Sequence, residues 1–293
     1  MGVAELHAHL ATGLTTVSRC WRVTRTDGLQ YGFTDHDRDL SFDGQTFRAD
    51  TGLSALALQQ ATGLSVDNTE AMGALRDDAL SEADIEAGRF DGAEVVCWLV
   101  NWHDTDQRKV LFRGTIGEIR RGDGAFHAEL RGLTEALNRP VGRVYQAPCP
   151  AVLGDGTCRV DLSGPRFRYE GRLLSATDNR SFTLGPLEAF EPGWFLRGRL
   201  EVLDGAASGL ALGIKRDQLR DGDRVIELWE PFGAPIIAGD TVRITAGCDK
   251  RFDTCRQKFH NGLNFQGFPD IPEEDWLMVF PSQSGSRMGG SRR

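Results

Sequence analysis

The chain has 293 residues and a formal net charge of −8, and this length suggests about two domains. Hydrophobic residues make up 40% and charged residues 26%, which is typical of a globular protein and excludes a disordered one. The excess of acidic residues disfavours general binding of nucleic acid, and no apolar run approaches the roughly 18 residues of a membrane-spanning helix.

The N-terminal part of the chain is predicted to begin with a helix and to continue as strands. The first residues carry no basic region, so we expect no secretory signal. We therefore expect the protein to be synthesised in the cytoplasm. Residues 4–12 are predicted to form a short helix. Alternating residues and turn signals then predict a strand from Thr15, a hairpin turn at Asp27-Gly28, and a turn at Asp43-Gly44 before a short strand over 46–49.

The middle of the chain mixes one ambiguous segment with clear strand signals. Residues 54–75 are apolar and small, with scattered glycines, and predict no single element. Ser81 followed by Asp84 resembles a capping box and predicts a short helix that ends near Gly88. The apolar patterns and turn residues then predict strands over 93–102, 107–121 and 125–132, followed by a short helix over 133–139 that Pro140 ends.

The part of the chain from about Phe167 consists of short predicted strands separated by Gly, Asp or Pro. Such regular short spacing is typical of a β-barrel or a β-sandwich. We therefore expect a mainly β fold with two β-rich units, about 1–147 and 160–247, and few helices. The basic, low-complexity end of the chain is expected to be flexible.

Four of the six cysteines form two pairs, spaced C-x8-C and C-x6-C, in loops rich in Gly, Pro and Asp. The pairs are Cys149 with Cys158 and Cys248 with Cys255, and they bracket the second β-rich unit. Four thiolates in one place form a soft site suited to Zn²⁺ or to an iron–sulfur cluster. Structural zinc usually uses a C-x2–4-C spacing, which neither pair has. Two disulfides, or reduced thiols without a metal, remain alternatives.

Three other groups of residues are weaker candidates for a functional site. Cys20 and Cys97 lie inside predicted strands and are expected to be buried apolar side chains. The run DHDRD at 35–39 has the residue types of a divalent-ion or acid–base site, but a polar turn is the favoured interpretation. Either Cys20 or Cys97 together with His103 and Asp104 has the residue types of a thiol protease, without any supporting motif. The glycine-rich nucleotide motifs and the HExxH motif are absent from the sequence.

The C-terminal cysteine segment carries a family resemblance. Residues 248–272, CDKRFDTCRQKFHNGLNFQGFPDIP, closely resemble the terminal signature of phage-type tail hub proteins of alphaproteobacterial gene transfer agents and related prophages. The cysteine loops are similar to those of minor tail protein L of lambda-like siphophages. Upstream segments, among them DIEAGRFDGAEV, FRGTIGEI and ELRGLTEALNRPVGRVYQAPCPAVLGDGTC, look like the same family, so the resemblance covers about 15–275.

The resemblance implies a fold and a metal site. It implies two tube-like β-barrel hub domains, and a [4Fe–4S] cluster whose ligands are the four paired cysteines, with structural zinc as the alternative. The implied order is an N-terminal hub domain (1–147), a first cysteine loop (148–159), a second β-barrel domain (160–247), a second cysteine loop with the C-terminal signature (248–276), and a flexible tail (277–293).

Residues near the second cysteine loop are expected to serve the cluster. Four thiolates around a cubane leave a net negative charge, which nearby cations would offset. A solvated loop, or contact with an acidic partner, is the alternative interpretation of these cations, and core packing is the alternative for the aromatic residues that would shield the cluster. The cations are Lys250, Arg251, Arg256 and Lys258, and the aromatic residues are Phe259, Phe265 and Phe268.

The resemblance also implies a structural function without catalysis. Its members are trimeric tail-tip or baseplate hub proteins that join the sixfold tail tube and distal tail ring to a threefold central fibre. A tail peptidase is a further possible neighbour, and DNA is expected only in transit through the lumen. The protein is expected in the assembled particle and not inserted in a membrane. Two alternatives of other classes are a tail-associated cell-wall hydrolase or protease and a cytosolic iron–sulfur redox protein.

Overall fold

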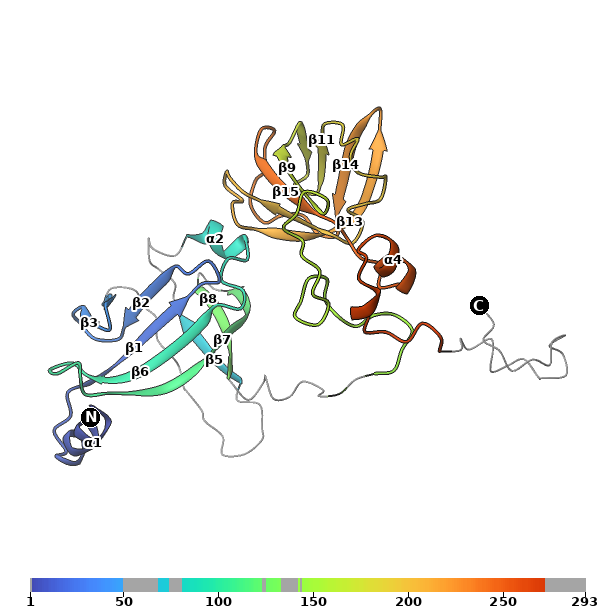
Figure 1. Cartoon of the computed structure of the whole chain (residues 1–293). Helices are drawn as coiled ribbons and strands as arrows, with labels where there is room; N and C mark the ends of the chain where they lie inside the picture. Colours follow the sequence, from blue (N-terminus) through green and yellow to red (C-terminus); the bar gives the residue numbers. More distant parts are fainter. Residues whose placement is uncertain are drawn as a thin grey trace. The chain divides into compact units, whose positions relative to one another are not determined.

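The fold is seen in a computed structural model that describes residues 2–49, 68–73, 81–122, 125–132, 142 and 144–271 (Figure 1). The chain divides into two compact units, Met1–Val141 and Gly142–Arg293. Each unit is built on its own antiparallel sheet, so the protein is mainly β with a few short helices. The predicted helix over 133–139 and the predicted flexible tail over 277–293 lie outside the described residues.

The first unit contains a six-stranded sheet with the order β2-β1-β6-β7-β8-β5 and a separate β3–β4 hairpin. All neighbouring strands of the six-stranded sheet pair in the antiparallel sense. The elements of this unit are α1 (Gly2–Ala11), β1 (Val17–Thr24), β2 (Gln30–Thr34), β3 (Leu40–Phe42), β4 (Gln45–Phe47), β5 (Asn68–Gly73), α2 (Glu82–Glu86), β6 (Glu94–Asn101), β7 (Arg108–Gly122) and β8 (Ala125–Gly132).

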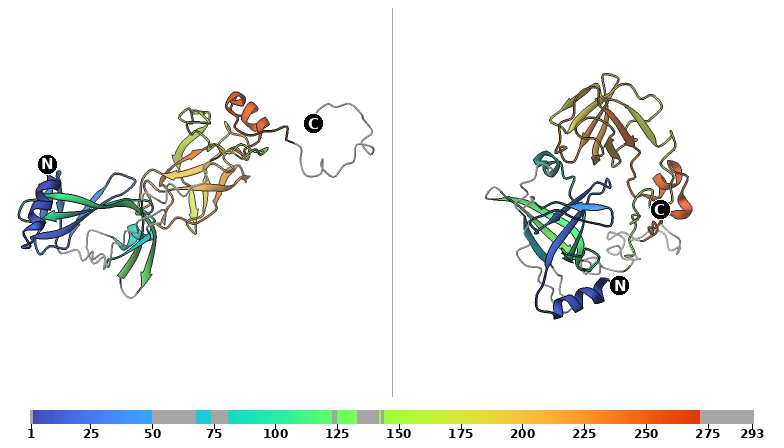
Figure 2. Two further views of the ribbon diagram at one scale, coloured as in Figure 1. Left: turned by 90° about the horizontal axis from the view of Figure 1, so that it is seen from below. Right: turned by 90° about the vertical axis from the view of Figure 1, so that its left-hand side faces the viewer.

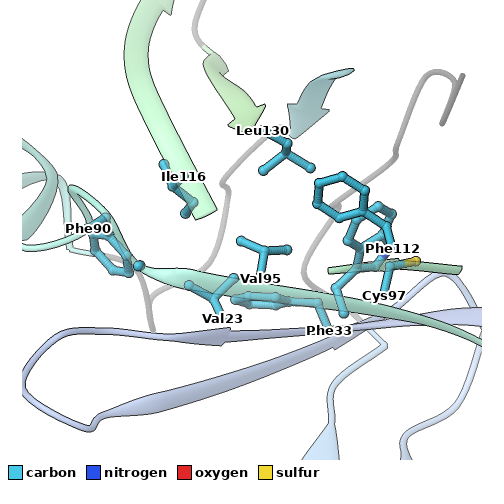
Figure 3. Packing of buried hydrophobic residues seen from close by; sticks show 10 residues of the cluster. Val23, Phe33, Phe90, Val95, Cys97, Phe112, Ile116 and Leu130 are labelled. Atoms are coloured by element: carbon cyan, nitrogen blue, oxygen red, sulfur yellow. The ribbon is translucent and has the colours of Figure 1, made fainter. Parts of the chain in front are cut away.

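Apolar side chains cover both faces of the first sheet. In β1, Trp21 and Val23 belong to one buried cluster, whereas Cys20 belongs to a second buried cluster. Figure 3 shows the first cluster, in which side chains from several strands meet. Strand β6 contributes to both clusters, and six of its eight residues are buried. Both faces of this strand are largely buried, which explains why the sequence over 93–102 is almost continuously apolar.

The predicted turns of the first unit are confirmed, and one predicted cap is not. Strands β1 and β2 form the hairpin, and β3 and β4 turn at Asp43 and Gly44, whose φ angles of 50° and 73° suit a tight turn. The predicted helix after Ser81 is α2, but the Ser81 side chain makes no capping hydrogen bond. None of the described helices is long and apolar enough to cross a membrane.

The second unit contains a seven-stranded sheet with the order β10-β11-β14-β13-β12-β15-β9. Strict alternation of buried and partly buried residues in β14 and β15 gives this sheet one apolar face. The elements are β9 (Arg168–Arg172), β10 (Ser175–Thr177), β11 (Ser181–Leu184), β12 (Arg199–Val202), β13 (Ala211–Arg220), β14 (Asp223–Leu228), β15 (Thr241–Thr245), α4 (Phe252–Gln257) and the 3₁₀ helix η1 (Gly262–Asn264).

Neither sheet is a closed barrel among the described residues, so the predicted barrels are wrong. Closure requires the two edge strands of a sheet to pair with each other, and neither β2 with β5 nor β9 with β10 does so. In the second unit the edge strands are instead consecutive parts of one segment. The Leu173 amide donates to the Asp240 carbonyl (2.9 Å) and the next amide, of Leu174, donates to the Thr183 carbonyl (2.8 Å). The sheet is rolled (Figure 2), and its two edge strands, β9 and β10, follow each other directly in the chain.

A buried ion pair supports the inner face of the second sheet. The side chains of Asp217 on β13 and Arg224 on β14 are both 0% exposed, with 3.3 Å between their charged groups. The Asp217 carboxylate accepts a hydrogen bond from the Phe195 amide at 2.8 Å. The Arg224 guanidinium donates to the carbonyls of Phe190 and Glu191. The pair therefore fixes the connection between β11 and β12 to the sheet.

Candidate metal centre

The two cysteine loops meet because of how the second sheet is paired. Strands β9 and β15 are antiparallel neighbours, with Arg168 opposite Thr245. The first loop leads into β9, and the second loop follows β15, so both loops start at the same end of this strand pair. Figure 1 shows α4, which belongs to the second loop, beside the loop that precedes β9. The fold of the sheet alone is therefore enough to bring the two pairs of cysteines together.

All four paired cysteines line one small cavity. They are Cys149, Cys158, Cys248 and Cys255, and the cavity is lined mainly by apolar groups from both loops. The free space between these side chains is about 10 Å³. All six cysteines of the chain are free thiols, so the predicted alternative of two disulfides is not what the structure contains.

Backbone contacts hold the two cysteine loops against each other. The Cys149 amide donates to the Lys250 carbonyl at 2.9 Å, and the Lys250 amide lies 3.4 Å from the Cys248 sulfur. Farther along, the Phe268 amide donates to the Gln146 carbonyl at 2.9 Å. These contacts hold the two cysteine loops side by side around the shared cavity.

Asp155 organises the first cysteine loop. One of its carboxylate oxygens accepts hydrogen bonds from the Thr157 amide (2.9 Å), the Thr157 hydroxyl (2.7 Å) and the Cys158 amide (2.6 Å). The other oxygen accepts from the Val152 amide at 2.9 Å. These hydrogen bonds lower the pKa of Asp155 to about 2, with the Cys158 amide as the largest cause. The carboxylate therefore takes the place of the secondary structure that this loop lacks.

Asn261 performs the corresponding role in the second cysteine loop. Its side-chain amide donates to the Cys158 carbonyl at 2.6 Å and lies 3.8 Å from the Cys158 sulfur. Its own carbonyl accepts from the Cys255 thiol at 3.3 Å. One residue thus contacts one cysteine of each pair. Sequence reasoning missed Asn261 and Asp155, although Asn and Asp in glycine-rich loops are known to bond nearby backbone groups.

Burial sets the protonation of the thiols in the second loop. Burial, together with the three other cysteines of the cavity, raises the pKa of Cys255 to about 11. Burial also raises the pKa of Cys248, which the Lys250 amide and ammonium oppose. As free groups these thiols are protonated at neutral pH. A metal would have to displace their protons, which makes metal binding pH-dependent.

Only one of the four predicted cations lines the cysteine cavity. Lys250 does so, and its ammonium group donates to the Ala151 carbonyl. Lys258 instead donates to the carbonyls of Trp194 (2.6 Å) and Gly247 (2.9 Å) and lies over the Trp194 ring. Burial lowers the pKa of Lys258, and nearby negative groups oppose this shift. The other two cations, Arg251 and Arg256, are exposed.

The predicted aromatic shield is present in part. Phe259, which is 7% exposed, and Phe265 line the cavity. Phe268 does not; its ring packs against Tyr145, with 4.7 Å between the ring centroids. The cavity is therefore bounded by two aromatic rings and by aliphatic groups, which would keep water away from anything bound to the thiols.

The residue types of the cavity fit a soft metal centre. Among the described residues, no group of three or more His, Cys, Asp or Glu side chains is arranged to hold a metal ion. Four thiols around one cavity are nevertheless the donor set of an iron–sulfur cluster or of zinc.

The weaker candidates of the first unit do not form a site. Cys20 and Cys97 are both 0% exposed in the apolar clusters, as predicted, whereas His103 is exposed. The run 35–39 is a turn whose carboxylates bond to backbone: Asp35 accepts from the Arg19 amide at 2.6 Å, and Asp39 accepts from the Ala49 amide at 2.9 Å.

The two buried thiols of the first unit are expected to resist alkylation. Burial raises the pKa of Cys20 to about 11 and raises the pKa of Cys97, so almost no thiolate exists at pH 8. We expect iodoacetamide to label them roughly a hundredfold more slowly in the folded chain than in urea. Peptide mass spectrometry measures both rates. Equal rates in the folded and unfolded chain would contradict the burial of these thiols.

Comparison with known proteins identifies two family models and a solved structure. Residues 3–161 match a family described as "Baseplate hub protein, N-terminal attachment domain", and residues 193–275 match one described as "Phage conserved hypothetical protein BR0599". A chain of a solved structure titled "Virion of native gene transfer agent (GTA) particle" is 54% identical, with 98% of each chain covered and a TM-score of 0.89. A search of the curated proteins finds no match.

Proposed function

Because the chain belongs to the family of phage baseplate hub proteins, we propose that it is a structural component of the tail tip in a phage-like particle of the gene transfer agent type. The observation that carries this proposal is the 54% identity to a chain of a gene transfer agent virion over 98% of both chains. Such similarity over the whole length includes both β-rich units and both cysteine loops. The role is architectural rather than catalytic.

Within the tail tip, we assign the chain to the junction between sixfold and threefold parts. It would bind the distal tail ring on one side and a central fibre protein on the other, with a tail peptidase as a further neighbour and DNA passing through the lumen. The two β-rich units support this assignment, because three copies place six such units around one axis. The edge strands of the first sheet would gain partners in such a ring.

The copy number in intact particles tests the adaptor role. We expect three copies per tail, because closed threefold symmetry with two units per chain is what matches a sixfold ring. Quantitative mass spectrometry against the tail-tube protein, or the symmetry of a tail density map, provides the number. Six copies or one would contradict the adaptor and leave membership of the hub family unaffected.

We further propose that Cys149, Cys158, Cys248 and Cys255 hold one [4Fe–4S] cluster, with structural zinc as the alternative. The shared cavity, the soft donor set and the resemblance to the cysteine loops of lambda-like tail proteins support it. When bound, the cluster supplies four bonds that tie the entry of the second sheet to its exit. Asp155 and Asn261 orient the thiol-bearing backbone, and Lys250 offsets part of the negative charge.

Metal analysis tests the cluster. Protein purified without oxygen is expected to be brown, with about four iron and four sulfide per chain at full loading. Stoichiometric zinc without sulfide would replace the cluster with a zinc site. Anaerobic protein that contains neither metal would overturn the metal centre, and the architectural role would then rest on the fold alone.

A further inference from the structure

A groove beside the cysteine loops carries five cationic side chains among apolar and small lining residues. It has a volume of about 530 Å³ and lies over β12, β15 and β9, within the second unit. Cys248 and Lys250 line both this groove and the cysteine cavity, so the sheet and the cysteine loops build the groove together. Its charged side chains are Arg168, Arg197, Arg199, Arg243 and Lys250, with Glu201 as the only carboxylate among the lining residues that the structure describes.

Two of these cations, Arg243 and Arg168, already contact carboxylates. Across β12, β15 and β9, the paired positions Glu201, Arg243 and Glu170 form one row. The Arg243 guanidinium lies 3.1 Å from the Glu201 carboxylate and 2.8 Å from the Glu170 carboxylate. Arg168 also contacts Glu170, at 3.4 Å. At this end of the groove the positive charges are therefore balanced by the carboxylates of Glu201 and Glu170.

The opposite end of the groove has uncompensated positive charge. Within the described part of the chain, Arg197, Arg199 and Lys250 have no carboxylate within 4.0 Å. The polar contacts recorded for the side chains of Arg197 and Lys250 are with backbone carbonyls, those of Asp249 and Ala151. Arg197 and Arg199 are exposed. Guanidinium groups held in this way are suited to charge-assisted hydrogen bonds with carboxylates.

We propose that this groove binds an acidic peptide segment of a neighbouring protein, and only the identity of that neighbour as a tail protein rests on the proposed function. Apolar side chains border the cations, among them Val152, which is 69% exposed, and Leu162. A peptide that alternates carboxylates with apolar residues matches both features. No aromatic side chain of the described residues lines the groove, whereas proteins that bind single-stranded nucleic acid commonly stack its bases on aromatic side chains, so an acidic peptide is the favoured occupant.

Binding of a synthetic peptide to the full chain tests the groove. The probe is a fluorescein-labelled peptide of alternating Glu and Leu, measured by fluorescence anisotropy at about 0.1 M salt, where the Debye length is roughly 10 Å. We expect the double variant Arg197→Gln/Arg199→Gln to raise the Kd about tenfold, because two charge-assisted contacts are lost. Hydrogen exchange is expected to show peptide-dependent protection at residues 197–199 and 248–250.

The matched control is Arg216→Gln/Arg220→Gln, which removes the same charge from exposed positions of β13 outside the groove. It is expected to leave the Kd within about twofold. An equal loss in both double variants would show nonspecific attraction and overturn the proposal. So would the absence of peptide binding by the unaltered chain, or tighter binding of a single-stranded oligonucleotide of equal charge. None of these results bears on the copy number in particles, which tests the hub role separately.

Discussion

Replacing Asp217 with Asn lowers the free energy of unfolding of the second unit by about 3–5 kcal/mol. The substitution keeps the shape of the side chain and removes its charge. Arg224, whose side chain is 0% exposed, then keeps a buried positive charge with only backbone carbonyls around it. Removing one partner of a buried pair costs more than removing both, because the remaining charge stays desolvated.

Urea unfolding followed by hydrogen exchange of peptides from the second unit measures this loss without interference from the first unit. The matched control is Asp253→Asn, which removes an exposed ion pair with Arg256 at 3.8 Å and should cost less than about 1 kcal/mol. The double variant Asp217→Leu/Arg224→Met is expected to be more stable than Asp217→Asn. Equal stability of Asp217→Asn and the control would contradict a structural role for the buried pair.

Replacing Cys248 with Ser is expected to weaken the cluster and to release the second cysteine loop. The substitution leaves one iron of the proposed cluster without its thiolate and only Cys255 to attach the second loop, which weakens the cluster, and the contacts that persist, such as Cys149 to Lys250, are single hydrogen bonds. Limited proteolysis should then cut between Arg251 and Lys258 at sites that are protected in the unaltered chain. The sheet over 168–245 should remain folded, because its strands have their own apolar face.

Cys97→Ala provides the control for this experiment. Cys97 is a buried thiol of the first unit, so the variant is expected to keep its iron and sulfide and the protease resistance of the second loop. Iron retained by Cys248→Ser would exclude Cys248 as a ligand. Protease sensitivity throughout residues 168–245 would show instead that the metal is needed to form the sheet.

The strands could be predicted from local patterns, and closure of the sheets could not. Short runs bounded by Gly, Asp and Pro mark most of the strands, since each strand leaves its apolar residues on one face or both. Whether β9 and β10 pair depends on positions far apart in the chain, which no local pattern contains. The burial of Arg224 could have been predicted from the sequence, because Arg224 alternates along β14 with the buried residues Ile226 and Leu228.

The sequence predicted the four cysteines of the candidate site and three of the residues that line its cavity, Lys250, Phe259 and Phe265. The two cysteine pairs stand out because their spacing is unusual and their loops are similar to those of a known family. Asp155 and Asn261 do not stand out, since many loop residues have the same side chains and only the folded backbone decides which amides they meet. The Ser81 capping box was predicted from spacing in the same way, and its hydrogen bond is absent.

The pairing of β9 with β15 also has a consequence for synthesis on the ribosome. These are the first and last strands of the second sheet, so the sheet cannot be completed until nearly the whole unit has been translated. Contacts between residues so distant in sequence form slowly, and folding of such sheets takes milliseconds to seconds. Cys149 and Cys158 are therefore made long before the loop that contains Cys248 and Cys255. The complete set of four thiols therefore exists only after translation has passed β15.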